Sequence, residues 1–276
     1  TGFTDVLTQN NTPGYILNSS SDQNYDNSML RQKLSMIYQA KLDTTSNLKI
    51  SVDGTLKNSA THNIYTSADT LNGALVNDQT RKLDNTVDQR AFNGSAFYTK
   101  KFNKPGRTFS FLLSESYSQS KANGFLVSHI NFYNSQGQVD STQDINESKT
   151  NNLQSSIFNT NLTYSEPFTK QLTLVMNYGV GVNHASADRS TFKASAPDVY
   201  NLLVDTLSSN YVFNQLLNHA GAILNYKQGK LVFNFGTHVT ADHFHQQDEI
   251  TSSVRNRNVL DWEPQAADVL IGTSAG

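Results

Sequence analysis

Apolar and polar residues alternate along residues 171–184, and this alternation predicts a β-strand. Side chains on a strand point to opposite faces in turn, so one face of the segment is apolar and the other is mostly small or polar. The apolar face carries Leu172, Leu174, Met176, Tyr178, Val180 and Val182, and the second face carries Thr173, Val175, Asn177, Gly179, Gly181 and Asn183.

The same alternation recurs along the chain and predicts eight strands in four hairpins. A short turn lies within each hairpin, centred near residues 45, 105, 168 and 229. Helical periodicity is absent from every segment long enough to test. The predicted strands cover about 30–42, 48–57, 92–98, 109–118, 152–164, 171–184, 220–226 and 231–246.

Short and long connections alternate between these strands. We predict long polar loops at 59–89, 121–150 and 185–211, and a further loop at 1–28. Transmembrane β-barrels have short turns on one side and long loops on the other. We therefore expect the first three of these loops to lie at one end of the sheet, opposite the short turns.

Aromatic residues stand close to the short turns, at the ends of the predicted strands. Tyr98, Tyr164 and Tyr226 lie just before three turns, and Phe109 and Phe233 lie just after two of them. Rings at strand ends match the aromatic girdle of a membrane barrel. The alternative is that tyrosine simply favours strands.

Composition narrows the class of protein. Of 276 residues, 16% are charged and 37% hydrophobic, both below globular averages, and the net charge of -2 gives no signal for a nucleic-acid partner. The absence of cysteine excludes a disulfide scaffold and a thiolate metal site. No apolar run approaches the ~18 residues of a membrane helix, and no signal peptide opens the chain at Thr1.

Two polar clusters could bind metal ions, and the sequence favours a simpler interpretation of both. Neither has a complete ligand set with suitable spacing, so both are interpreted as solvated groups. No catalytic or nucleotide-binding motif occurs, and Gly179 and Gly181 are predicted to serve curvature or close packing. The clusters are His243 and His245 with Asp242, Asp248 and Glu249, and Asp140 with Asp144 and Glu147.

Several segments resemble the outer membrane protein β-barrel family, which is similar to the large TonB-dependent receptors of Gram-negative outer membranes. The resemblance covers about 30–266 and rests on loose turn and strand patterns. The segments that carry it are 92–109, 162–170 running into 174–179, 188–189 and 257–266.

The resemblance implies a cell outer membrane location and a role in binding and uptake of a bulky nutrient or an iron complex. It also implies contact with outer-membrane lipid, an extracellular ligand and an energy-coupling periplasmic protein. We expect an all-β, antiparallel up-and-down meander of about eight long strands. Residues 1–276 would form a single, incomplete barrel segment, and the remaining strands and the plug would belong to a longer chain.

The incomplete barrel leads to a specific expectation for the edges of the sheet. The strands at 30–42 and 231–246 should be unpaired edges, apart from a short ninth strand opening near Leu260. The alternative is a soluble or surface-attached β-sandwich, such as an adhesin or a carbohydrate-binding protein. Neither interpretation predicts an enzyme, a cofactor, or a catalytic or metal-binding residue. A third, less supported interpretation is an enzyme with the same fold, such as an outer-membrane protease or lipase.

Overall fold

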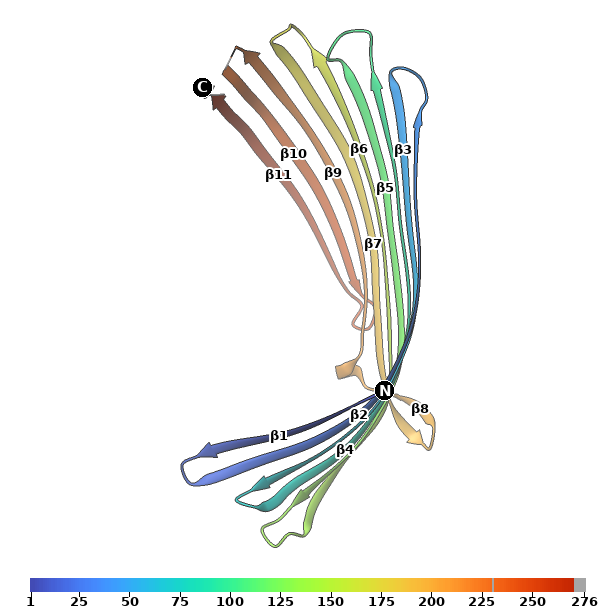
Figure 1. Ribbon diagram of the computed structural model, residues 1–276, viewed down its shortest axis with the longest axis vertical. Coiled ribbons are helices and arrows are strands. Elements are labelled where there is room, and N and C mark those ends of the chain that lie inside the picture. Colours follow the sequence, from blue (N-terminus) through green and yellow to red (C-terminus); the bar gives the residue numbers. More distant parts are fainter. Residues whose placement is uncertain (230, 271–276) are drawn as a thin grey trace.

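The computed structural model describes residues 1–229 and 231–270 as one long, curved antiparallel sheet of 11 strands (Figure 1). The strands follow one another as a meander, and only β8 lies off the path, paired with β7. The strands are β1 (Gly2–Thr12), β2 (Tyr15–Lys41), β3 (Ser46–Leu71), β4 (Ala74–Lys101), β5 (Thr108–Tyr133), β6 (Val139–Pro167), β7 (Leu172–Ala196), β8 (Val199–Leu203), β9 (Ser209–Gln228), β10 (Leu231–Asp248) and β11 (Ser253–Leu270), with the short 3-10 helix η1 (Asp205–Leu207) after β8.

The sheet is a single layer without a hydrophobic core. Among the residues whose exposure the structure gives, no apolar side chain is fully buried, and many large ones are exposed. A β-sandwich would bury the apolar faces of two sheets against each other. The described residues form one sheet, so the sandwich alternative is wrong. No helix in the described part of the chain is long and apolar enough to cross a membrane.

The prediction of long polar loops is wrong, because those residues continue the strands. Residues 59–89 form the far part of β3 and the first part of β4, joined at Asn72 and Gly73. Both turn residues have positive φ, as a two-residue type I′ hairpin turn requires. Residues 121–150 likewise extend β5 and β6, and much of 185–211 belongs to β7, β8 and β9.

The predicted loop at 1–28 is also a pair of strands. β1 pairs with the first part of β2 from Gly2 opposite Tyr25 to Thr12 opposite Tyr15. The turn falls at Pro13 and Gly14, where the glycine has a φ of 98°. The proline and glycine were recognisable as a turn from the sequence, whereas the polar strands on either side of them were not.

The predicted position of these segments is confirmed. β5 runs from the turn that contains Pro105 to the opposite end of the sheet, where Tyr133 pairs with Val139 at the start of β6. In Figure 1 the short turns lie at the upper end and the other hairpin turns of β1 to β6 at the lower end. Short turns and long segments therefore extend from opposite ends of the sheet.

The sheet is open. Within the described ranges, no backbone ladder joins β1 or β2 to β10 or β11. Residues 26–41 of β2 pair only with β3, as expected for an edge. β11 covers the outer side of β10 over 18 residues, so the ninth strand predicted near Leu260 exists and is longer than expected.

The long strands β2 to β7 each divide into two parts that differ in side-chain pattern. We call the part next to the short turns the short-turn half and the remainder the far half. On the convex face, the boundary between the two halves is marked by one cross-strand row of residues. This row is Leu56, Arg90, Gln119, Gln154, Ser186 and Val212.

Candidate functional site: a lipid-facing band and a polar concave face

The convex face of the short-turn half forms an apolar band across the strands. The cross-strand registers bring the alternate apolar positions of neighbouring strands together. Water in contact with such a band is unfavourable by ~25 cal/mol for each Å² of apolar surface, whereas lipid is not. The band includes Leu34, Met36 and Tyr38 of β2, Leu48, Ile50 and Val52 of β3, Phe92 and Tyr98 of β4, Phe109, Phe111 and Leu113 of β5, Phe158, Leu162 and Tyr164 of β6, Leu174, Met176 and Tyr178 of β7, Leu216 and Leu224 of β9, Phe233, Phe235 and Val239 of β10, and Leu260 and Trp262 of β11.

The face assignment predicted for β7 agrees with the exposure of its side chains. Met176, Tyr178 and Val182 are 39%, 49% and 44% exposed, whereas Gly179 and Gly181 are buried. Side chains crowd together on the concave face of a curved sheet and spread apart on the convex face. The apolar side chains therefore lie on the convex face and the polar ones on the concave face.

Aromatic rings border the band at the short turns, at the positions that the sequence predicted. Tyr98 pairs with Phe111 across the strands, and its ring centroid lies 6.3 Å from that of Phe109. Tyr226 pairs with Phe233. Rings with a polar edge at strand ends are typical of a membrane–water interface.

One carboxylate, Glu115, lies inside the band. It faces Gly94 on β4 and Phe158 on β6 across the ladder. The Ser156 hydroxyl donates a 2.9 Å hydrogen bond to it. Glu115 is close to the boundary row, so its charged end can reach toward water beyond the band.

An ionic cluster holds together two neighbouring short turns. The Lys104 ammonium and the Arg107 guanidinium each donate a 2.8 Å hydrogen bond to Glu166 at the end of β6. The Tyr164 hydroxyl donates another, at 2.7 Å. These bonds favour the ionised carboxylate, so Arg107, then Lys104 and Tyr164, lower the pKa of Glu166 to about 2. The cluster ties the β4–β5 turn to the β6–β7 hairpin.

Asp43 plays the same role in the first short turn. It accepts hydrogen bonds from the hydroxyl and backbone N–H of Thr45, at 2.7 and 2.6 Å, and one from Lys100 at 3.0 Å. These bonds, those of Thr45 foremost, hold the pKa of Asp43 well below its usual range. The β2–β3 turn is thereby fixed to the end of β4.

On the concave face, glycines allow neighbouring side chains to lie flat on the sheet. The His219 imidazole occupies the space that a Cβ on Gly179 would need, and the Thr160 carbonyl oxygen would lie 2.7 Å from it. The Asn159 side chain crosses Gly181 in the same way, 2.9 Å from the Cβ position. The predicted role of these two glycines in close packing is confirmed.

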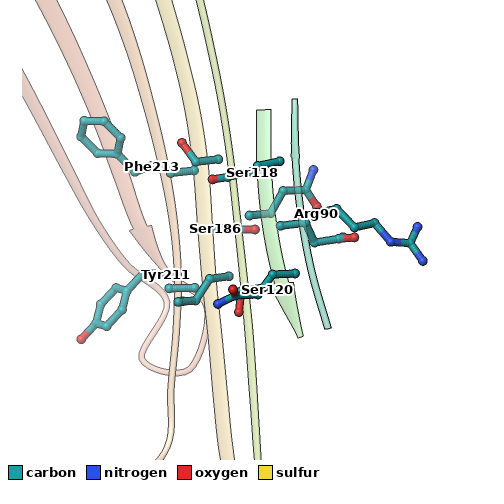
Figure 2. A pocket seen from close by; sticks show the side chains of 14 residues that line it. Arg90, Ser118, Ser120, Ser186, Tyr211 and Phe213 are labelled. Atoms are coloured by element: carbon teal, nitrogen blue, oxygen red, sulfur yellow. The ribbon is translucent and has the colours of Figure 1, made fainter. Parts of the chain in front are cut away.

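A hollow of about 540 Å³ opens on the concave face, just beyond the boundary of the band (Figure 2). Its floor consists of small side chains, and its walls include larger ones. Figure 2 shows Tyr211 and Phe213 pointing to one side of the sheet and Arg90 to the other. The concave-face lining is Gln89, Ala91, Ser118, Ser120, Leu153, Ser155, Ala185, Ala187, Tyr211 and Phe213. This hollow was not predicted from the sequence. The usable signal was the small serine and alanine side chains at alternate positions of neighbouring strands, which place them on one face of the sheet.

In the far half the convex face is mostly polar, with Phe125 and Val127 as exposed apolar exceptions, and it carries hydrogen-bonded acids. Asp78 accepts hydrogen bonds from Tyr133 at 2.7 Å and Asn131 at 2.8 Å, and these lower its pKa. Asp144 lies 2.6 Å from the His129 imidazole and raises the pKa of that histidine. A surface of this kind is stable in water.

The structure separates the residues of the first candidate cluster, which the sequence analysis interprets as solvated groups. His243 and His245 lie on the convex face beside Asn258 and Asn256, with His245 at 2.7 Å from its partner. Asp242 points to the concave face and accepts a 2.9 Å hydrogen bond from Gln215. Over residues 1–229 and 231–270, no group of three or more metal-binding side chains converges.

The second candidate cluster is separated in the same way. Asp144 lies on the convex face beside His129, whereas Glu147 lies on the concave face, 3.2 Å from the Lys149 ammonium. The two-residue period of the strand sends positions 144 and 147 to opposite faces. Asp140 precedes both, near the start of β6.

A single-layer meander with a convex apolar band and a ring of aromatic side chains defines a transmembrane β-barrel protein. The pattern of the "Outer membrane protein beta-barrel family" matches residues 100–267, more than half of the chain. The chain belongs to this family, and its place is the cell outer membrane, where the convex band contacts lipid.

Two further comparisons were made. A search of the solved structures finds the outer membrane protease OmpT from Escherichia coli, with 10% sequence identity and a TM-score of 0.27, over 96% of this chain and 99% of that chain. A search of the curated proteins finds no match.

Proposed function

We propose that this chain forms part of the wall of an outer-membrane receptor, similar to the TonB-dependent receptors, that binds a bulky solute and takes part in its uptake. The observation that carries the proposal is the hollow on the concave face. It lies where the lipid band ends, so a solute arriving from outside meets it before the membrane-level lumen. Its volume is within the range of roughly 300–1,000 Å³ found for small-molecule sites.

The open edges support the proposal that further strands complete the barrel. Residues 33–41 of β2 are level with the apolar band and pair with β3 alone. Unpaired backbone groups cost several kcal/mol each in a membrane, so such an edge needs a partner strand there. In the proposed receptor, the remaining strands close the wall, a plug fills the lumen and an energy-coupling periplasmic protein drives uptake.

The proposed role of the hollow is binding without catalysis. Tyr211 and Phe213 offer ring faces, and Ser118, Ser120 and Gln89 offer hydroxyl and amide groups. Rings pack against the apolar faces of a solute, and the polar groups fix its orientation. Such a set is suited to recognition and release.

Uptake measurements in intact cells test this function. Cells with and without the protein would be given labelled oligosaccharides and labelled ferric complexes, with and without an uncoupler. We expect one class of solute to accumulate only in energised cells that carry the protein. Accumulation that is equal in both strains for every solute would contradict the proposal.

A pair of variants links uptake to the hollow. Tyr211→Ala with Phe213→Ala should lower the initial uptake rate about tenfold, since each aromatic contact contributes about 0.5–1.5 kcal/mol. Tyr65→Ala is the matched control, because Tyr65 lies on the concave face in the far half, under Arg81, away from the hollow. If the control variant lowers the uptake rate equally, uptake does not depend on the aromatic side chains of the hollow.

A further inference from the structure

Three cations lie together on the concave face at the edge of the sheet. Arg31 on β2 is directly opposite Lys57 on β3, and Lys33 is two positions along from Arg31 on the same face. Opposite positions place Cβ atoms about 4.5–5.5 Å apart, so the positive charges are close. We call Arg31, Lys33 and Lys57 the cationic triad.

The triad is not neutralised by nearby acids. None of its members forms an ion pair with another described residue. Asp53, the acid beside them on this face, accepts a 2.6 Å hydrogen bond from Ser35. Like charges directly opposite each other on a sheet are destabilising. An external anion bound between the three cations would offset this repulsion.

The backbone register connects the triad to the hollow. Lys57 is directly opposite Gln89, which lines the hollow, and neighbouring strands are about 4.8 Å apart. A second positive group, Arg255 and Arg257 on β11, lies beyond the other wall. One concave-face row runs through both groups and the hollow: Lys33, Thr55, Ala91, Ser118, Ser155, Ala185, Phe213, Gln246 and Arg255.

The convex face carries negatively charged side chains level with the hollow and further along the far half. Asp84 and Asp88 of β4, Asp144 of β6 and Asp188 of β7 all lie on it. The cations Lys82, Arg90 and Lys121 share the convex face with these acids, and the acids Asp53, Asp242 and Asp248 share the concave face with the five cations named above, so each face carries an excess of one sign. An excess of positive charge beside a concave hollow raises the local concentration of anionic ligands.

From this arrangement we infer that the solute bound at the concave face is an organic anion that carries carboxylate or phosphate groups. This inference rests on the proposed receptor function and adds the charge of the solute to it. Arg31 can bind an oxyanion through two parallel N–H donors, and the two lysines add charge. The uncharged part of the solute lies in the hollow against Tyr211 and Phe213.

Binding of size-matched probes to the purified protein in detergent tests the inference. The probes are trigalacturonate for carboxylate, inositol hexakisphosphate for phosphate, and neutral maltotriose of the same length as the first. We expect one of the two anions to bind at least about tenfold more tightly than maltotriose. Raising the salt concentration should weaken the binding of the anion and leave the binding of maltotriose unchanged, because exposed charges are screened.

Four sets of variants locate the effect. Arg31→Gln, Lys33→Gln and Lys57→Gln together should remove most of the preference for the anion. Arg31→Lys, Lys33→Arg and Lys57→Arg together keep the charge and should retain it. The control is Lys82→Gln with Lys121→Gln, two cations of the convex face in the far half, which should leave binding unchanged. Arg255→Gln with Arg257→Gln tests the second group if the first variant does not fold.

The outcomes separate this inference from the receptor function. Anions that bind no better than maltotriose, or a control variant as damaging as the triad variant, would overturn the inference. Energised uptake of a neutral solute in the cell assay would then leave the receptor function standing. Conversely, anion binding that depends on the triad, in a protein that supports no uptake, would support the inference and count against the receptor.

Discussion

The two halves of the sheet share one backbone ladder and differ in the surface they present. On the convex face of β7, Met176 and Tyr178 lie in the short-turn half, Ser186 lies on the boundary, and Asp188 lies in the far half. The pairing of β7 with β6 continues without a register shift from Pro167 opposite Thr173 to Glu147 opposite Lys193. Hydrogen bonding therefore makes the strand in both halves, and the side chains decide whether lipid or water surrounds it.

The lengths of the strands show how much of the sheet lies outside the membrane. β3 to β7 each contain 25 to 29 residues. A transmembrane strand needs about 9–11 residues, and 26 residues extend roughly 85 Å. More than half of each strand therefore stands in water, as the polar convex face of the far half requires.

The largest expected contrast between the halves is in accessibility to reagents. The chain contains no cysteine, so single cysteines can be introduced at Met176, Asn177 and Ser186 without background. Met176→Cys should react with a lipid-soluble probe and resist a water-soluble maleimide, and Ser186→Cys should do the reverse. Asn177→Cys should resist the lipid-soluble probe. Equal labelling at 176 and 177 would refute the assignment of the faces.

An arginine scan on one strand face should give the largest difference in stability. Met176→Arg should cost about 2–4 kcal/mol in free energy of unfolding, since it places a charge in the lipid band. Ser186→Arg, on the same face at the boundary row, should change it by less than about 0.5 kcal/mol. Urea titration of the protein in lipid vesicles measures both. Similar costs for the two variants would mean that the band does not end at the boundary row.

Glycine substitution should distinguish the two faces within the short-turn half. Gly179→Ala should cost about 1–3 kcal/mol, because His219 and the Thr160 carbonyl leave no room for a methyl group. Gly54→Ala on the convex face should be nearly neutral, as nothing lies within 4 Å of its Cβ position. In a protein that also carries His219→Ala, the Gly179→Ala substitution should cost less free energy of unfolding. Some of the cost should remain, because the Thr160 carbonyl still lies too close to the added methyl group. The same urea titration serves, and equal costs would contradict the close packing.

The smallest expected effect is a pH dependence at the short turns. The pKa of Glu166 is lowered to about 2, so the stability it contributes is present above its ordinary pKa of 4.5 and is lost as the pH falls toward 2. Glu166→Gln should be less stable than wild type at pH 7 and should show a smaller decline between about pH 5 and pH 2. Arg107→Gln should reduce the decline similarly. Parallel pH profiles for all three proteins would argue against the ionic cluster.

The sequence predicted the short-turn half well, because lipid on one face leaves a two-residue period in hydrophobicity. It predicted the far half poorly, because water on both faces removes that period while the ladder continues. Asn72 and Gly73 were the missed signal, since this pair favours a two-residue hairpin turn and so predicts strands on both sides.

The hollow and the cationic triad depend on registers that the sequence alone does not give. Arg31 and Lys57 are 26 positions apart and meet only because β2 and β3 pair in one particular register. Tyr211 joins Ser120 in the hollow across two intervening strands. The face of the strand on which each residue lies can be predicted from the sequence. The residues that lie beside it on neighbouring strands cannot.

The two-sided polarity of the far half has a consequence for the order of assembly. A strand that is polar on both faces can slip by two residues at little cost, because no burial fixes its register. In the short-turn half, the same slip would move apolar side chains out of the lipid band. It would also separate the aromatic side chains that face each other across the strands beside each short turn. We expect the short-turn half to pair first and to fix the register of the far half. Backbone pairing would then proceed along each strand from the membrane outward.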